Sequence, residues 1–260
     1  MDGESPQILA LDFDGVLCDG LREYFQITCR TYQQIWSTNS LEAWAEPFYR
    51  LRPVIETGWE MPVLLRALVL GLPETELAHN WSAIAPQVLD SEGLDSRDLA
   101  HRLDQTRDHW LQNDLPGWLR LHRFYPGVCD QLQAWLRAGS PQLFIITTKE
   151  GRFVQRLLQD QGLPLPAPQI FGKEVQQPKA ATLRQLRAAT QPTPDLWFVE
   201  DRLQTLQTIA AQPDLASVSL FLATWGYNTA TAQAIAQADP HLHPLSLAQF
   251  TGDLRAWRST

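Results

Sequence analysis

One short stretch near the start of the chain constrains the fold more than any other. It is the apolar run Ile8–Leu11, which ends in Asp12-Phe13-Asp14-Gly15. A short run rich in β-forming residues predicts a buried strand of an α/β sheet. Asp12 then lies at the carboxyl end of that strand, where open α/β sheets place their ligands. Taken alone, Asp-Phe-Asp-Gly is also typical of a strand that simply ends in a turn.

Asp12 and Asp14 are separated by a single residue. Two carboxylates this close repel each other, so they need a shared cation or a proton to occupy one site. Oxygen ligands suit a hard divalent ion. The pair is therefore a candidate site for a hard divalent ion such as Mg²⁺.

The segment from about 20 to 125 contains no convincing pair of strands. Its apolar residues recur at helical spacing, and prolines and glycines interrupt it repeatedly, so we expect several short helices. Six of the ten tryptophans fall here. Because tryptophans bury large areas, they predict the core of a helical subdomain.

From residue 126 onward, predicted strands alternate with predicted helices. The expected strands cover residues 142–149, 169–172, 196–199 and 218–223. This alternation predicts an α/β fold with a parallel sheet that is covered by helices on both faces. Near the C-terminal end, we expect His241 and His243 to lie in a loop and not to bind a metal.

Polar groups follow several of these strands. Thr147 and Thr148 lie at the end of the strand expected at residues 142–149, and Glu200-Asp201 follows the strand at 196–199. Lys179 comes directly after Pro178, which suits the first turn of a helix. Because the carboxyl ends of parallel strands share one edge of the sheet, we expect these groups to converge on Asp12 and Asp14.

This order of motifs resembles the haloacid dehalogenase (HAD) superfamily: Asp-x-Asp-Gly, an apolar strand to Thr, a lysine, and an apolar strand to an acidic pair. Two further tetrapeptides resemble its phosphoglycolate phosphatase-like branch, namely residues 125–128 (Tyr-Pro-Gly-Val) and 224–227 (Thr-Trp-Gly-Tyr). The resemblance implies a Rossmann-like doubly wound core formed by residues 1–19 and 126–260. It also implies an α-helical cap, residues 20–125, inserted between the first two motifs.

The resemblance implies a Mg²⁺-dependent phosphatase that hydrolyses a small phosphorylated metabolite. Asp12 would be the nucleophile that becomes an aspartyl-phosphate, and Asp14 the general acid and base. Thr147 and Lys179 would hold the phosphoryl group, since a lysine offers it a compact charge.

The implied metal ligands are Asp12, the backbone carbonyl of Asp14, and Asp201, with Glu200 in support. Two further residues are candidates for binding substrate. Thr148 extends the second motif, and Arg52 lies in the helical segment, where an arginine can grip a carboxylate or phosphate. Arg52 can equally be one of a solvated pair with Arg50.

Several alternatives remain open at this point. Lys173 competes with Lys179 for the lysine motif, which here reads Gln-Gln-Pro-Lys. Many relatives have Gly-Asp in the fourth motif where this chain has Glu200-Asp201, a pair that occurs in mutase-like relatives. A phosphomutase of the β-phosphoglucomutase type is therefore a second enzyme hypothesis. A non-catalytic phosphate-binding protein on the same fold is the third hypothesis.

The charge balance limits the partners. The chain has 21 Lys and Arg against 29 Asp and Glu, a net charge of −8, which argues against a nucleic-acid partner. Three cysteines without a Cys-x-x-Cys spacing predict free thiols in a reducing compartment, so we expect a cytoplasmic protein. The polar N-terminus does not resemble a signal peptide, and no apolar run is long enough for a membrane span. The sequence leaves open whether the protein is a monomer or a dimer.

Overall fold

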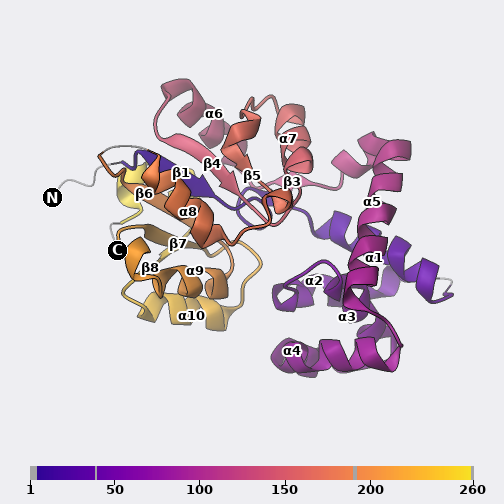
Figure 1. The fold of residues 1–260 in the computed structure, drawn as a ribbon. Helices are drawn as coiled ribbons and strands as arrows, with labels where there is room; N and C mark the ends of the chain where they lie inside the picture. Colours follow the sequence, from indigo (N-terminus) through magenta and orange to yellow (C-terminus); the bar gives the residue numbers. More distant parts are fainter. Residues whose placement is uncertain (1–4, 39, 190–191, 259–260) are drawn as a thin grey trace. The chain divides into compact units, whose positions relative to one another are not determined.

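The computed structural model describes residues 5–38, 40–189 and 192–258. The chain divides into two compact units. One comprises Met1–Asp19 together with Arg123–Thr260, and the other comprises Gly20–His122. The first unit contains the sheet, and the described part of the second is helical (Figure 1).

The first unit is built on a six-stranded sheet of order β5-β4-β1-β6-β7-β8. Every neighbouring pair in this sheet is parallel. The strands are β1 (Ile8–Leu11), β4 (Gln142–Ile146), β5 (Ile170–Phe171), β6 (Leu196–Glu200), β7 (Ser219–Ala223) and β8 (Leu242–Leu245). The predicted fold class, an α/β parallel sheet with an inserted helical segment, is therefore confirmed.

Helices cover both faces of the sheet, with α6 and α7 on one side and α8, α9 and α10 on the other (Figure 1). Their bounds are α6 (Val128–Ala138), α7 (Gly151–Asp160), α8 (Lys179–Ala188), α9 (Leu203–Ala210) and α10 (Ala230–Ala238), followed by the short α11 (Leu247–Phe250). All four residues of β1 are buried. This explains why the strand reads as a continuous apolar run without polar alternation.

The C-terminal segment closes one of these faces. Trp257 is fully buried, with its ring centroid 5.6 Å from that of Trp197 in β6 and 5.4 Å from that of Phe250 in α11. Its indole N–H donates to the backbone oxygen of Gln249 at 2.8 Å. A buried tryptophan with a satisfied N–H contributes a large apolar area without leaving an unpaired donor.

The structure corrects one expectation about this region. His243 does not lie in a loop, because it is part of β8 and pairs with Phe221 of β7. The strand Leu-His-Pro-Leu carries neither the β-branched residues nor the continuous apolar character of the inner strands. At the edge of a sheet, a proline and a polar residue are tolerated, which is why the strand was missed.

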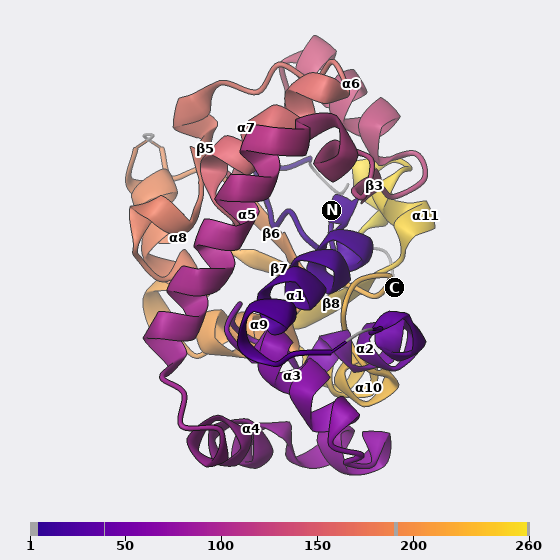
Figure 2. The ribbon, with the colours of Figure 1, turned by 90° about the vertical axis from the view of Figure 1, so that its right-hand side faces the viewer.

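The second unit consists of α1 (Leu21–Ile35), α2 (Ala45–Leu51), α3 (Glu60–Val69), α4 (Glu74–Ser91) and α5 (Ser96–Leu119). α1 and α5 lie side by side (Figure 2). Between them, the fully buried Glu23 accepts hydrogen bonds from Arg107 Nε at 2.7 Å and from Trp118 Nε1 at 3.1 Å. Trp118 thus donates a hydrogen bond to a buried carboxylate and also fills the core of this unit.

The chain passes between the two units twice, and the two passages pair with each other. β2 (Cys18–Asp19) and β3 (Arg123–Phe124) form a two-stranded antiparallel ribbon, with Asp19 opposite Arg123. Among the residues that the structure describes, no helix is both long enough and apolar enough to cross a membrane.

Candidate active site

The central position of β1 brings three strand ends together. β4 lies on one side of β1 and β6 on the other, with Leu11 opposite both Ile145 and Val199. Asp12, Thr147 and Asp201 follow these three strands directly. From β1 the chain moves to β4 and β5 on one side, then crosses back to β6, β7 and β8 on the other side, and such a switch point is where α/β sheets bind their ligands.

Lys179 lies at the centre of the charged groups. Its Nζ is 2.9 Å from Asp12 Oδ1 and 2.6 Å from Glu200 Oε2. Burial alone would lower the pKa of Lys179, but the carboxylates of Asp12 and Glu200 raise it above its usual range. The lysine therefore stays charged, and it holds the ends of β1 and β6 together from the first turn of α8.

The buried carboxylates outnumber this lysine. Oxygens of Asp12, Glu200 and Asp201 lie within 4.8 Å of one another, and all three residues are buried. Burial raises the pKa of Asp12 from 3.8 to about 6, with the Lys179 charge opposing the shift and Glu200 adding to it. Burial likewise raises the pKa of Glu200. These three neighbouring carboxylates, two of which contact the one ammonium, form a donor set that a divalent cation would neutralise.

The three carboxylates differ in how they are engaged. Glu200 Oε2 accepts from Lys179, and its Oε1 accepts from the backbone N–H of Arg202 at 3.1 Å. Asp201 Oδ2 accepts from the backbone N–H of Tyr227 at 2.7 Å. Both oxygens of Glu200 are thus taken up by protein donors.

Asp14 lies outside this acidic group and pairs with a residue that sequence reasoning did not assign to the site. Lys149 Nζ donates to both Asp14 oxygens, at 3.2 and 3.3 Å, and only 7% of the lysine side chain is exposed. The sequence showed Lys149 at the end of its strand, directly after Thr147-Thr148. The contact itself depends on the register of β4 against β1, which the sequence does not state.

Two glycines pack around Asp201. A Cβ at Gly15, where φ is +86°, would lie 2.0 Å from Asp201 Oδ2, and a Cβ at Gly226 would lie 2.3 Å from Asp201 Cβ. The Asn228 side chain also donates to the backbone oxygen of Asp201 at 3.1 Å. The loop after β7 therefore holds Asp201 in position. In the sequence, this loop was indicated only by the tetrapeptide at residues 224–227, which ends in Gly226-Tyr227.

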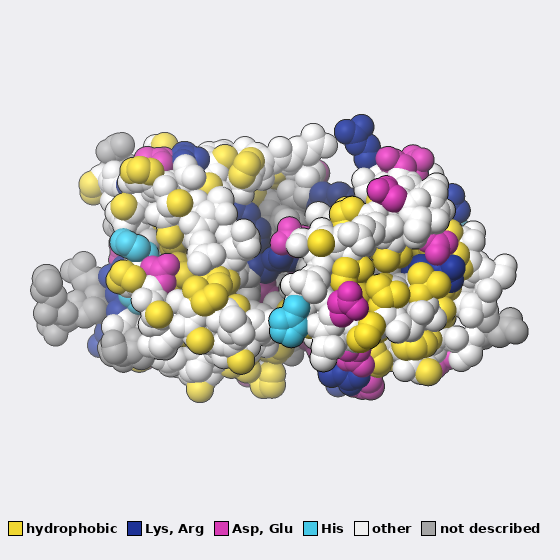
Figure 3. Space-filling model, turned by 90° about the horizontal axis from the view of Figure 1, so that it is seen from below, with side chains coloured by type: hydrophobic (Ala, Val, Ile, Leu, Met, Phe, Trp, Pro, Cys, Tyr) yellow, Lys and Arg dark blue, Asp and Glu magenta, His cyan; other side chains and the backbone are white. Residues whose placement is uncertain are grey.

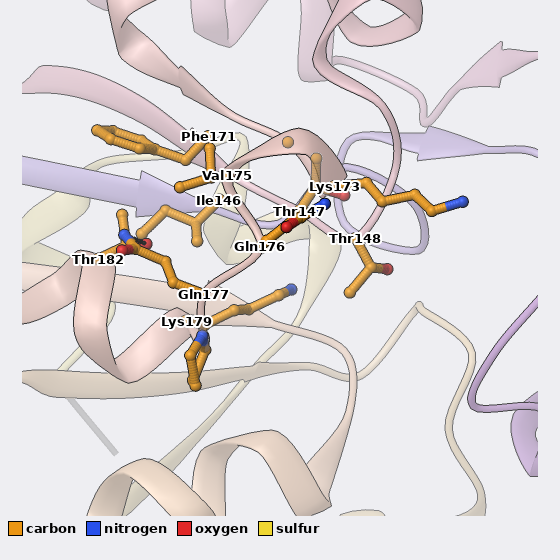
Figure 4. Close-up of a pocket in the computed structure, with 12 residues that line it drawn as sticks. Ile146, Thr147, Thr148, Phe171, Lys173, Val175, Gln176, Gln177, Lys179 and Thr182 are labelled. Carbon is orange, nitrogen blue, oxygen red and sulfur yellow. Dashed lines mark hydrogen bonds between the residues drawn. The ribbon is translucent and has the colours of Figure 1, made fainter.

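A cavity of about 310 Å³ adjoins these groups (Figure 4). Thr147, Thr148 and Lys179 line one part of it, and Phe171 and Val175 form an apolar wall. In Figure 4, Lys179 reaches towards the threonines, whereas the amino group of Lys173 is directed away from them. Arg52, the other candidate for binding substrate, belongs to the helical unit, where its Nη1 donates to the backbone oxygen of Ile55 at 3.0 Å.

The structure thus brings together Asp12, Asp14, Thr147, Thr148, Lys179, Glu200 and Asp201 at one edge of the sheet. The catalytic and binding roles assigned to them remain predictions.

The packing around Asp201 generates a first prediction. In Gly226→Ala, the new methyl group must displace Asp201 or the Gly15 carbonyl, so we expect a loss of about 1–3 kcal/mol in the free energy of unfolding. Gly58→Ala is the matched control, because its nearest contact is an ordinary 3.5 Å. Chemical denaturation of both variants measures the difference. Equal stabilities would show that the loop after β7 does not hold Asp201 tightly.

The raised pKa of Asp12 generates a second prediction, for metal-free protein. Between the usual pKa of 3.8 and about 6, the folded state binds a proton that the unfolded state has lost. The free energy of unfolding therefore falls as pH rises through this window. Asp12→Asn cannot ionise, so at pH 7 it should exceed the wild type in stability by an amount on the order of 3 kcal/mol, at ~1.4 kcal/mol per pKa unit.

This advantage should shrink towards pH 4, where the wild-type carboxyl is protonated in the folded state and close to half protonated in the unfolded state. Urea denaturation in a chelator at pH 4 and pH 7 tests it, with the exposed Asp160→Asn as control. An advantage that does not change with pH would contradict the assigned cause.

Comparison with known proteins identifies the fold. No family model matches the sequence, and no curated protein matches it. Solved structures do match. A predicted phosphoglycolate phosphatase from Haemophilus somnus aligns with a TM-score of 0.59 at 18% identity, covering 96% of this chain and 95% of that chain.

Two further structures agree. A predicted phosphatase from Clostridium acetobutylicum has a TM-score of 0.58 at 12% identity, covering 95% of this chain and 97% of its own. A hydrolase of the haloacid dehalogenase-like family from Streptococcus pneumoniae has a TM-score of 0.52 at 15% identity, covering 94% and 95%. At these identities the likeness concerns the fold, and it spans nearly the whole of each chain. The chain therefore has the fold of the haloacid dehalogenase-like hydrolases, as its sequence motifs predicted.

Proposed function

We propose that the protein is a Mg²⁺-dependent phosphatase that hydrolyses a small phosphorylated metabolite through an aspartyl-phosphate on Asp12. The observation that carries the proposal is the position of Asp12. It lies at the end of the central strand, 2.9 Å from Lys179, next to a buried group of further carboxylates. Phosphoryl transfer requires little besides such positioning and charge neutralisation.

Asp12 supplies the nucleophile. A carboxyl with a pKa of about 6 is mostly ionised at pH 7, so one oxygen can attack phosphorus while the ester oxygen leaves. Water then attacks the aspartyl-phosphate and restores the carboxylate. Lys179 and the Thr147 hydroxyl would bind the phosphoryl oxygens.

Asp14 supplies the proton transfers. It would protonate the leaving oxygen in the first step and accept a proton from water in the second. Lys149 donates to both of its oxygens and so fixes the orientation of the carboxylate. This orientation is needed, because proton transfer requires the carboxyl within hydrogen-bond distance of the reacting oxygen.

The donor set fits Mg²⁺. Asp12 and Asp201 would hold the ion, with the backbone carbonyl of Asp14 as a third protein ligand and Glu200 in a supporting position. When bound, Mg²⁺ neutralises charge on the transferring phosphoryl group.

We propose a small phosphorylated substrate and no nucleic-acid partner. On the face seen in Figure 3, Lys and Arg side chains form small separate groups beside Asp and Glu, without a continuous basic surface. We propose that the helical unit acts as a cap that excludes water and selects the substrate, with Arg52 as a contributor. The three free cysteines suit a reducing compartment such as the cytoplasm.

A screen for phosphate release tests the function. It would cover sugar phosphates, phosphoglycolate and nucleotides, each with Mg²⁺ and with a chelator. Formation of a positional isomer without release of phosphate would instead identify a phosphomutase, the second hypothesis, to which the Glu200-Asp201 pair points. Neither activity, combined with measurable binding of phosphate, would identify a non-catalytic binding protein.

Replacing the nucleophile gives the third prediction. Asp12→Asn keeps the shape of the side chain but removes its nucleophilic charge, so turnover should fall by at least about 100-fold, or ~2.7 kcal/mol in the barrier. Circular dichroism and the turnover number on the best substrate of the screen measure the effect, beside Asp160→Asn. Activity above roughly one per cent of the wild type would rule out Asp12 as the nucleophile.

The metal site gives the fourth prediction. Because both Glu200 oxygens are held by Lys179 and the Arg202 N–H, Asp201→Asn should weaken Mg²⁺ binding more than Glu200→Gln does. The rise in melting temperature on titration with Mg²⁺ reports this affinity without any substrate. The opposite ranking would place the cation at Glu200 and would reverse the assignment.

A further inference from the structure

Tyr227 connects the acidic group to both passages of the chain between the two units. Its backbone N–H donates to Asp201 Oδ2 at 2.7 Å, and its hydroxyl donates to Asp19 Oδ1 at 2.9 Å. Asp19 ends β2, the first passage. The second passage reaches the same place, because Asp19 pairs with Arg123 of β3 and the Tyr125 ring lies against that of Trp225, with centroids 6.5 Å apart. Tyr227 thus contacts a carboxylate of the candidate site and the end of β2, which is itself paired with β3.

We propose that Tyr227 is a positioning residue that couples the state of Asp201 to the β2–β3 ribbon, so that a divalent cation held at Asp201 stabilises the ribbon. The part of this inference that concerns the cation rests on the proposed function. The part that concerns Asp201 and the ribbon does not.

Tyr227 donates two hydrogen bonds to carboxylates, and such bonds are strong. Each of its two bonds to aspartate ends on a carboxylate, and charge-assisted bonds are roughly twice as strong as neutral ones. Only 9% of Tyr227 and 2% of Asp201 are exposed, so water competes little for these groups. The ring is rigid and Tyr227 is buried, so few rotations are open to the side chain between its backbone N–H and its hydroxyl.

The neighbouring residues leave the loop little freedom to absorb such a displacement. Gly226 packs against Asp201 Cβ and the Gly15 carbonyl so closely that a methyl group does not fit. The Trp225 indole N–H donates to the backbone oxygen of Val16 at 3.0 Å. Next to the ribbon, the backbone N–H of Tyr125 donates to the backbone oxygen of Leu17 at 3.0 Å. Asp201, the loop after β7 and the ribbon therefore form one continuous set of contacts.

The coupling is reciprocal, as any linkage between two sites must be. Fixing Asp201 restrains Tyr227 and reduces local opening of the ribbon. Restraining the ribbon favours the position of Asp201 in which Oδ2 faces the Tyr227 N–H. Because both connections to the helical unit run through this ribbon, the coupling gives the acidic group an influence on how freely that unit moves.

Amide hydrogen exchange over residues 16–20 and 122–126 tests the inference. In metal-free protein, Tyr227→Phe removes the hydroxyl and keeps the N–H, so exchange in the ribbon should rise by about 10-fold or more, the effect expected for a lost bond to a charged group. Asp201→Asn should raise it too. The double variant should rise no further than the larger single effect, because the two changes interrupt the same chain of contacts.

Tyr32→Phe is the matched control. It removes a buried hydroxyl in the helical unit that accepts from Arg66 at 3.3 Å, and it should leave exchange in the ribbon unchanged. Asp19→Asn is the second variant, to be used if Tyr227→Phe does not fold. It weakens the same bond from the other side and keeps the tyrosine.

Addition of Mg²⁺ completes the test. In the wild type it should slow exchange in the ribbon. In Tyr227→Phe it should raise the melting temperature as in the wild type but no longer slow that exchange. Equal slowing in both proteins, or additive effects in the metal-free double variant, would overturn the coupling. If Mg²⁺ changes neither the melting temperature nor the exchange of the wild type, the proposed function is contradicted. The exchange rates of the single and double variants in metal-free protein then test the coupling between Asp201 and the ribbon.

Discussion

The charge imbalance around Lys179 is the constraint on which the rest of the site depends. One ammonium contacts two of three neighbouring buried carboxylates, which leaves an excess of negative charge and is unfavourable in a dry environment. The protein tolerates it because Lys179 pairs with Asp12 and Glu200 at once and because backbone N–H groups satisfy further oxygens. The remaining negative charge makes the site suitable for a cation, and under the proposed function that cation would in turn attract the phosphate. Stability is given up here at the place where function requires it.

The sheet makes this concentration of charge possible. In a parallel sheet, the chain returns to the same edge at the end of each strand, so groups far apart in sequence arrive at one point. β1 lies between β4 and β6, and its two neighbours contribute Thr147 and the Glu200-Asp201 pair. The helices on both faces exclude water from the strands and leave only their ends accessible.

The sequence was sufficient for the parts of the site that follow from strand ends. Asp12, Thr147 and Asp201 could be identified because an apolar run that stops at a polar residue marks such an end. Lys179 could be favoured over Lys173 because a proline precedes it at the start of a helix. The contacts of Lys149 with Asp14 and of Tyr227 with Asp19 could not be predicted, since they depend on side-chain directions between segments distant in sequence. β8 was missed because an edge strand needs no apolar alternation, so its sequence resembles a loop.

The central position of β1 also has a consequence for how the chain folds. β1 is the first strand in sequence, yet neither of its neighbours exists until the chain has reached Gln142 and then Leu196. During synthesis, this apolar strand must wait with both edges unpaired while the whole helical unit is made. Helical units rich in local contacts form quickly, whereas pairings across such long separations form slowly. The inserted helices therefore have time to fold first, and the early strand is the segment most in need of protection from aggregation until its partners arrive.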